Sequence, residues 1–159
     1  LSPLASLTNL ETLYLSGPLG NDIGLLDASP LANLTHLREL SLYGDISNFE
    51  FIRSLQELQT LEIYNWSFTG STPPSLAPLG ELSHLTSLTL YCSDLLNDLS
   101  FFSGLTNLRS ATINLDRNGP VHNLEPLRNL QNLTSLTVMG SECITDWSAV
   151  EHVASVTGS

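Results

Sequence analysis

Apolar residues recur along the chain in a pattern of five positions. In the stretch LGELSHLTSLTL they fall at Leu79, Leu82, Leu85, Leu88 and Leu90, in three steps of three residues and one step of two. A step of three suits a tight helical turn, whereas a step of two suits a strand with one buried face. The pattern therefore predicts a short helix, a turn and a short strand that all direct their apolar residues into one core.

The same pattern occurs six times between Leu4 and Val138, and a seventh copy begins at Val150, Val153 and Val156. Successive copies start about 21–27 residues apart, and repetition at such a period is typical of a solenoid of stacked repeats. We expect the seventh copy to end before any strand. The six expected strands are Glu11–Ser16, Glu39–Tyr43, Thr60–Tyr64, Ser87–Tyr91, Ser110–Asn114 and Ser135–Met139.

The segments SPLASLTNLETLYL and SPLANLTHLRELSL resemble leucine-rich repeats, most closely the bacterial class of about 22 residues found in internalin-type proteins. The resemblance covers nearly the whole chain. It implies an α/β fold, a right-handed solenoid with six strands in one parallel concave sheet and short helices or 3-10 turns on the convex side. It also implies a recognition module that is not an enzyme and needs no cofactor.

Residues 1–159 are interpreted as a single leucine-rich-repeat domain of about six repeats and a partial seventh. Leu1-Ser2-Pro3-Leu4 matches the interior of a later unit, Ala28-Ser29-Pro30-Leu31, so we expect the chain to be a fragment of a larger protein. No apolar run approaches the roughly 18 residues of a membrane span. The sequence indicates no cellular compartment.

Charge and candidate chemistry narrow the function classes. The formal net charge is −11, and the basic residues are all Arg, which argues against a nucleic-acid partner because phosphate binding needs clustered Lys and Arg. The acidic balance is interpreted as a solubility feature. His36 and His84 lie two repeats apart in a turn position that Asn fills elsewhere, so neither a metal site nor a catalytic site is expected.

The two cysteines, Cys92 and Cys143, also lie two repeats apart. Stacked strands are separated by about 4.8 Å, which puts the two positions near 10 Å apart. A disulfide needs Cα atoms roughly 4.4–6.8 Å apart. We expect two free and mostly buried thiols.

Two features of the helix starts are also informative. Pro precedes the first apolar position in four units, and a Ser before it could cap the helix. Asp27, Asp98 and Asp146 each lie two residues before a Ser, where they are expected to stabilise the preceding loop.

The outward residues of the expected strands form columns across the concave face. One column holds Tyr43, Tyr64 and Tyr91 on three successive strands, with Trp66 and Phe68 in the loop beside it. Aromatic side chains dominate recognition hot spots, but such a column can also serve only to stabilise the sheet. Both interpretations stay open. The candidate partner-binding residues are Tyr14, Glu39, Tyr43, Glu62, Tyr64, Trp66, Phe68 and Tyr91.

Two hypotheses of function follow. The first is a recognition domain that binds a protein ligand through its concave face and the loop-bearing rim beside it. Its parent could be a surface adhesin or a sensor of the nucleotide-binding immune ATPase type. The second is a structural spacer attached to an enzyme. The sequence does not name the ligand.

Overall fold

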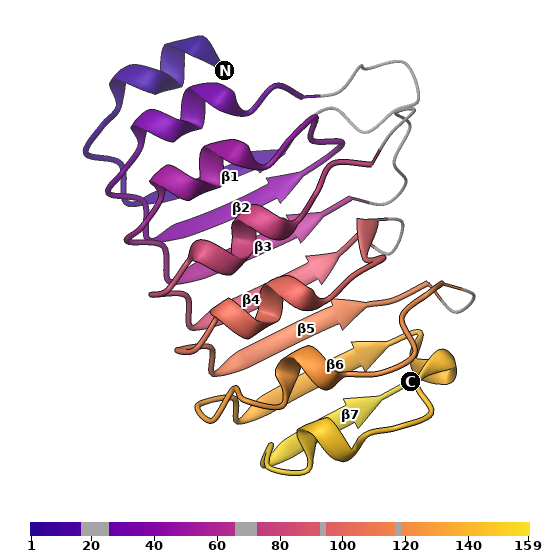
Figure 1. Cartoon of the computed structure of the whole chain (residues 1–159). Coiled ribbons are helices and arrows are strands. Elements are labelled where there is room, and N and C mark those ends of the chain that lie inside the picture. Colours follow the sequence, from indigo (N-terminus) through magenta and orange to yellow (C-terminus); the bar gives the residue numbers. More distant parts are fainter. Residues whose placement is uncertain (17–25, 66–72, 93–94, 117–118) are drawn as a thin grey trace.

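The computed structural model describes residues 1–16, 26–65, 73–92, 95–116 and 119–159 of the chain. One parallel sheet runs through the molecule, and short helices stack along one side of it (Figure 1). The strands are β1 (Thr12–Ser16), β2 (Glu39–Tyr43), β3 (Thr60–Tyr64), β4 (Ser87–Tyr91), β5 (Ser110–Asn114), β6 (Ser135–Met139) and β7 (Ser155–Gly158). They lie side by side in chain order, as a leucine-rich-repeat solenoid requires.

The helices of the described residues are short 3-10 helices, written η here. They are η1 (Ser2–Ser6), η2 (Ser29–Asn33), η3 (Glu50–Ser54), η4 (Ala77–Glu81), η6 (Ser100–Gly104), η7 (Glu125–Leu127), η8 (Ser141–Cys143) and η9 (Ser148–Val150).

Backbone hydrogen bonds explain the three-residue spacing of the apolar pattern. In the fourth repeat the N–H of Leu82 donates to the carbonyl of Leu79 (3.1 Å), and the N–H of Leu85 donates to that of Leu82 (3.0 Å). Side chains three residues apart eclipse one another in 3-10 geometry, so each leucine lands on the same side of the chain. The strand that follows returns to a two-residue spacing and directs Leu88 and Leu90 into the same core.

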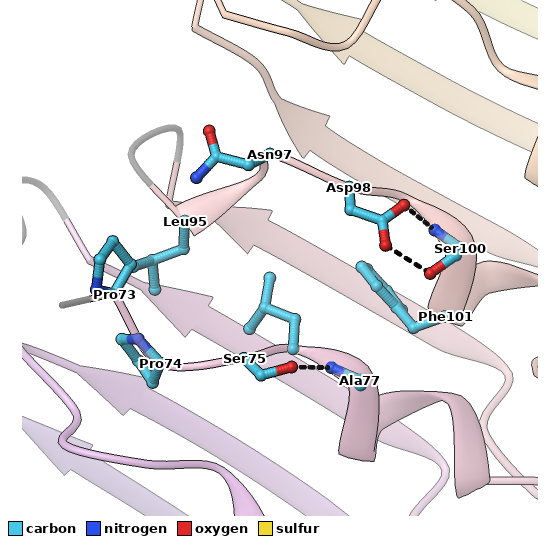
Figure 2. A pocket seen from close by; sticks show the side chains of 10 residues that line it. Pro73, Pro74, Ser75, Ala77, Leu95, Asn97, Asp98, Ser100 and Phe101 are labelled. Carbon is cyan, nitrogen blue, oxygen red and sulfur yellow. Dashed lines mark hydrogen bonds between the residues drawn. The ribbon is translucent and has the colours of Figure 1, made fainter.

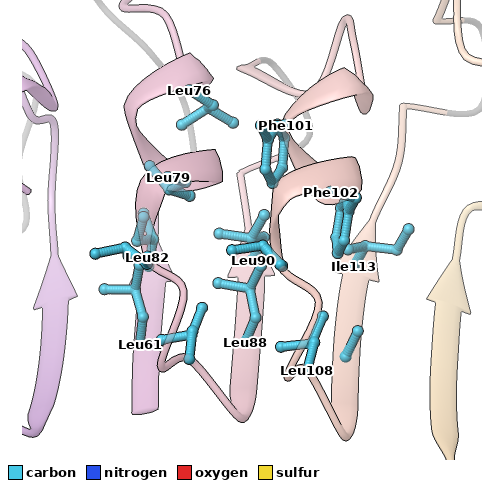
Figure 3. Close-up of a cluster of buried hydrophobic side chains, with 14 of the residues drawn as sticks. Leu61, Leu76, Leu79, Leu82, Leu88, Leu90, Phe101, Phe102, Leu108 and Ile113 are labelled. Atoms are coloured by element: carbon cyan, nitrogen blue, oxygen red, sulfur yellow. The ribbon is translucent and has the colours of Figure 1, made fainter. Parts of the chain in front are cut away.

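The core lies between the helices and the sheet. Figure 3 shows Leu79 and Leu82 of one repeat, Leu88 and Leu90 of its strand and Phe102 of the next repeat gathered there. In repeats two to six, all five pattern positions are buried, as expected. Each buried leucine contributes roughly 1.5–3 kcal/mol relative to an exposed one.

The first repeat is an exception to the expected burial. Leu4, Leu10, Leu13 and Leu15 are only half-buried, and Leu7 keeps 48% of its surface exposed. Among the described residues, the first repeat packs against the second repeat alone, so these leucines have described apolar neighbours on one side only.

The expectation of six strands is wrong, because the seventh copy ends in a strand. β7 pairs with β6 in parallel, and its Val156 is aligned with Leu136, the fourth pattern position. Val156 follows Val153 by three residues and therefore resembles the third position. The seventh repeat omits one three-residue turn: Val153 N–H donates to Val150 (3.0 Å), and the chain then enters the strand directly.

The aspartates before the helices stabilise the adjoining turns, as expected, whereas the serines before the prolines do not cap the helices. Asp27, Asp98 and Asp146 accept the backbone N–H of Ser29, Ser100 and Ser148 at 2.8–2.9 Å. None of the described 3-10 helices has a side-chain hydrogen bond from its N-cap residue. Ser2 and Ser29 begin their helices rather than capping them, because helical geometry starts one residue before the proline.

Both cysteines are free thiols, as expected. Cys92 is buried and Cys143 is partly exposed.

Candidate functional site

The concave face carries polar side chains of uneven size. On β5 to β7 the outward residues are mostly Ser and Thr, whereas β1 to β4 carry tyrosines and glutamates among them. The register places Tyr14, Ser41 and Glu62 side by side on β1, β2 and β3. It also places Tyr43, Tyr64 and Tyr91 side by side on β2, β3 and β4. The six residues Tyr14, Glu39, Tyr43, Glu62, Tyr64 and Tyr91 are called the tyrosine–glutamate patch below.

The three tyrosines of β2 to β4 form one continuous ring stack. The centroids of Tyr43 and Tyr64 are 4.4 Å apart and their rings are 2° from parallel. Tyr64 and Tyr91 are 5.2 Å apart at 12°. Each ring is half-buried. Burial raises the pKa of the Tyr64 hydroxyl above its usual value, with a further contribution from the negative charge of Glu62.

The glutamates of the patch surround a small serine. Ser41 is 3% exposed, and its hydroxyl donates to Oε2 of Glu62 at 2.8 Å. The hydroxyl of Tyr14 donates to Oε2 of Glu39 at 3.4 Å. The charge of Glu39 raises the pKa of Tyr14, and the charge of Glu62 acts in the same direction. Both carboxylates therefore lie close enough to affect one exposed phenol.

The ion pairs of the described residues lie away from this patch. Arg38 approaches Glu57 (Nε to Oε2, 3.8 Å) in the turns before the strands. On the helix side of the sheet, Arg53 pairs with Glu50 and Glu81, and Arg128 pairs with Glu125. Within the described part of the chain, no basic side chain forms an ion pair with Glu39 or Glu62.

Six of the eight predicted partner-binding residues thus lie on one face of four adjacent strands. Trp66 and Phe68 lie outside the described residues. Sequence reasoning overlooked Ser41. The signal was present, because Ser41 is the smallest residue between two tyrosines and two glutamates in the expected columns. The binding role of these residues stays a prediction.

Two of the histidines contact a neighbouring repeat. Nδ1 of His84 lies 2.9 Å from the carbonyl of Gln56 in the preceding repeat. The side chains of Asn107 and Asn132 donate in the same way to the repeat before theirs, at 2.8 and 2.9 Å. His36 contacts Glu57 at 3.0 Å. Among the residues that the structure describes, no three His, Cys, Asp or Glu side chains are grouped to hold a metal ion.

A hollow of about 290 Å³ opens between the starts of η4 and η6 (Figure 2). Pro73, Pro74, Leu95 and Phe101 form its apolar lining. The Asp98 carboxylate at its edge accepts both the N–H and the hydroxyl of Ser100, at 2.8 and 2.6 Å. Both oxygens of that carboxylate are used to stabilise the turn before η6. We therefore interpret the hollow as a feature of the packing of two repeats.

Comparison with known proteins supports the leucine-rich-repeat assignment. No family model and no curated protein matches the sequence. Among solved structures, an internalin of Listeria monocytogenes (inlF) matches with a TM-score of 0.75 and 27% identity, over 99% of this chain and 43% of that one. Internalin C2 of the same bacterium matches with a TM-score of 0.74 and 25% identity, over 100% of this chain and 66% of that one. A leucine-rich-repeat protein of Leptospira interrogans shares the fold (TM-score 0.62, 18% identity, 97% of this chain and 44% of that one).

The fold is that of the leucine-rich-repeat proteins, most like the bacterial internalins. The chain spans less than two thirds of the length of either internalin. In the described part of the chain, no helix has the length and apolar character needed to cross a membrane.

Proposed function

We propose that this protein is a non-catalytic recognition module that binds a protein ligand through the concave face of its sheet. The tyrosine–glutamate patch forms the centre of the binding surface. We also propose further contacts from the loop-bearing rim, including Trp66 and Phe68, which lie outside the described residues. Solenoids of stacked repeats commonly use such concave faces as extended binding surfaces.

The observation that carries this proposal is the stack of Tyr43, Tyr64 and Tyr91. Their rings are half-buried and nearly parallel, so they are ordered before any ligand arrives. A tyrosine offers a large contact area with few rotatable bonds, and prior ordering removes part of the entropic cost of binding. The same stacking also supports the sheet, since paired side chains on neighbouring strands stabilise each other.

The location of the stack also favours recognition. The apolar core lies on the other side of the sheet, beneath the helices. A column that only supported the sheet would not need aromatic rings, since Thr89, Thr112 and Thr137 form such a column of small side chains on β4 to β6. Aromatic rings at a partly exposed face add contact area that a ligand can cover.

The test begins with binders selected from a displayed library of random peptides against the immobilised protein. Amide hydrogen exchange with and without a selected peptide then maps the surface that it covers. We expect slower exchange at β1 to β4 and unchanged exchange at η2 to η7. Protection confined to the helix side or to β5–β7 would overturn the proposal.

A further inference from the structure

The tyrosine–glutamate patch also indicates which kind of ligand it fits. Resting on the proposed function, we propose that the bound segment of the partner protein is basic, and that an arginine side chain docks over Ser41 between Glu39 and Glu62.

The first argument is the arrangement of side chains around Ser41. Tyr14 and Glu62 are its neighbours on the adjacent strands, while Glu39 and Tyr43 precede and follow it on the same face of β2. Two carboxylates and two phenol rings therefore surround one small, buried residue. Glu39 and Glu62 are diagonal neighbours on adjacent strands. The usual strand spacing and the rise over two residues place their Cα atoms at a separation of roughly 8 Å.

The second argument is charge. Each described ion pair of the chain involves a turn or helix residue, and neither Glu39 nor Glu62 has a basic partner within the described residues. The described outward positions of β1 to β7 hold no Arg. With a net charge of −11 for the whole chain, the face attracts a positively charged segment.

The third argument is the chemistry of the two possible cations. A guanidinium is planar, donates to carboxylates in a fork, and stacks on aromatic rings. It is also less strongly hydrated than the ammonium of Lys, so less is lost when it leaves water. The patch offers carboxylates and ring faces together, because among the described residues the stack ends at Tyr43, whose register partner on β1 is Ser16 rather than another ring.

The geometry around Ser41 also positions one acceptor. Since the Ser41 hydroxyl holds Oε2 of Glu62 at 2.8 Å, the carboxylate is oriented before binding and keeps further lone pairs for a donor. Tyr14 orients Glu39 in the same manner at 3.4 Å.

The experiment is an NMR titration of the ¹⁵N-labelled protein with the peptide acetyl-Gly-Ser-Arg-Ser-Gly-amide. The control peptides carry Lys, Glu or citrulline, the neutral isostere of arginine, in its place. We expect saturable shifts at Tyr14, Ser41, Tyr43 and Glu62 with the Arg peptide, weaker shifts with Lys, and none with citrulline or Glu.

The matched variants are Glu39→Gln with Glu62→Gln on the patch, and Glu142→Gln with Glu151→Gln away from it. Both pairs remove two negative charges. Loss of charge-assisted hydrogen bonds should weaken Arg-peptide binding by at least about tenfold in the first pair only. An equal loss in both pairs, equal binding of the citrulline peptide, or no saturable shifts would overturn the arginine site.

The peptides selected for the concave face separate this inference from the proposed function. If they require Tyr64 and Tyr91 but bind the Glu39→Gln, Glu62→Gln variant unchanged, the face recognises proteins without an arginine site. If they cover another surface, the proposed function fails as well. Titration of the same residues by a neutral sugar such as methyl glucoside, without a response to the Arg peptide, would also overturn the inference.

Discussion

At the scale of the residue, one local hydrogen bond recurs before the helices. A side-chain oxygen accepts the backbone N–H two residues later, which fixes the turn that leads into six of the eight described 3-10 helices. Where the acceptor is Asp, the charged form is favoured. The residues that accept this bond are Asp27, Asn48, Ser75, Asp98, Asn123 and Asp146.

These turns make stability depend on acidic pH. Hydrogen bonds from Ser29, Ser100 and Ser148 lower the pKa of Asp27, Asp98 and Asp146. Since the folded-state pKa lies below the unfolded value of about 3.9, their stabilisation is complete above that value and is lost as pH falls through the lower folded values.

Urea unfolding between pH 5 and pH 2.5 checks this effect. The triple variant Asp27→Asn, Asp98→Asn, Asp146→Asn should lose less stability on acidification than the wild type, because Asn keeps the acceptor but does not titrate. The double variant Glu142→Gln, Glu151→Gln serves as a control for charge. Identical pH dependence of the triple variant and the wild type would contradict this assignment.

Asn65, the residue after β3, gives a second prediction at this scale. It is 3% exposed, and neither its amide nitrogen nor its amide oxygen has a hydrogen-bond partner among the residues that the structure describes. A buried unpartnered polar group costs about 1–3 kcal/mol. In the fifth repeat the corresponding position after the strand is the buried Leu115.

We therefore expect Asn65→Leu to stabilise the protein by about 1–3 kcal/mol, which corresponds to roughly 2–4 °C in Tm for each kcal/mol. Thermal unfolding followed by circular dichroism measures the change. A lower Tm would mean that the site favours a polar group and would contradict the prediction that Asn65 destabilises the fold.

At the scale of the element, η4 and η6 approach each other closely enough for their backbones to touch. A Cβ on Gly104 would lie 2.0 Å from the carbonyl oxygen of Gly80, a distance that no side chain can adopt without movement of the backbone. Glycine is required here because two helices touch through their backbones.

Gly104→Ala should therefore destabilise the protein by about 1–3 kcal/mol, the usual cost of overpacking. Ser54→Ala, at the exposed last position of η3, is the matched control and should stay within about 0.5 kcal/mol of wild type. Urea denaturation provides both values. If Gly104→Ala unfolds at the same midpoint and slope as Ser54→Ala, the close contact is not a constraint.

Most elements could be predicted from spacing alone, because three residues is the span of a 3-10 hydrogen bond and two is the repeat of a strand. Five of the six predicted strands have the bounds that the structure shows, and β1 starts one residue later. β7 was missed because the spacing of Val156 is ambiguous. Val156 lies three residues after Val153, as the third pattern position would, but in the structure it occupies the fourth position, on the strand. Only pairing with β6 resolves that choice.

For the candidate site, the sequence could predict which outward residues line up across neighbouring strands. Alternation along each strand placed Tyr43, Tyr64 and Tyr91 on one face, and parallel pairing placed them in line. The contact of Ser41 with Glu62 and the near-parallel rings depend on side-chain rotamers, which spacing does not determine.

At the scale of the whole molecule, the two faces of the sheet have separate roles. The helix side holds the continuous core, and the other face carries an ordered aromatic stack beside two glutamates that lack basic partners among the described residues. Solenoid stability is approximately a sum over repeats and their interfaces. A change on the concave face can therefore alter recognition while most of the stability, which comes from the core, remains.

The most direct test of concave-face recognition is the affinity of the variant Tyr64→Ala, Tyr91→Ala for a library-selected peptide. It is measured by calorimetry well below the Tm of every variant, with Thr112→Ala, Thr137→Ala on β5 and β6 as the matched control. Truncation at a hot spot should cost at least about 2 kcal/mol, or roughly thirtyfold in Kd, while the control binds as wild type does. Unchanged Kd for the folded double tyrosine variant would contradict the account and leave the stack as a support for the sheet.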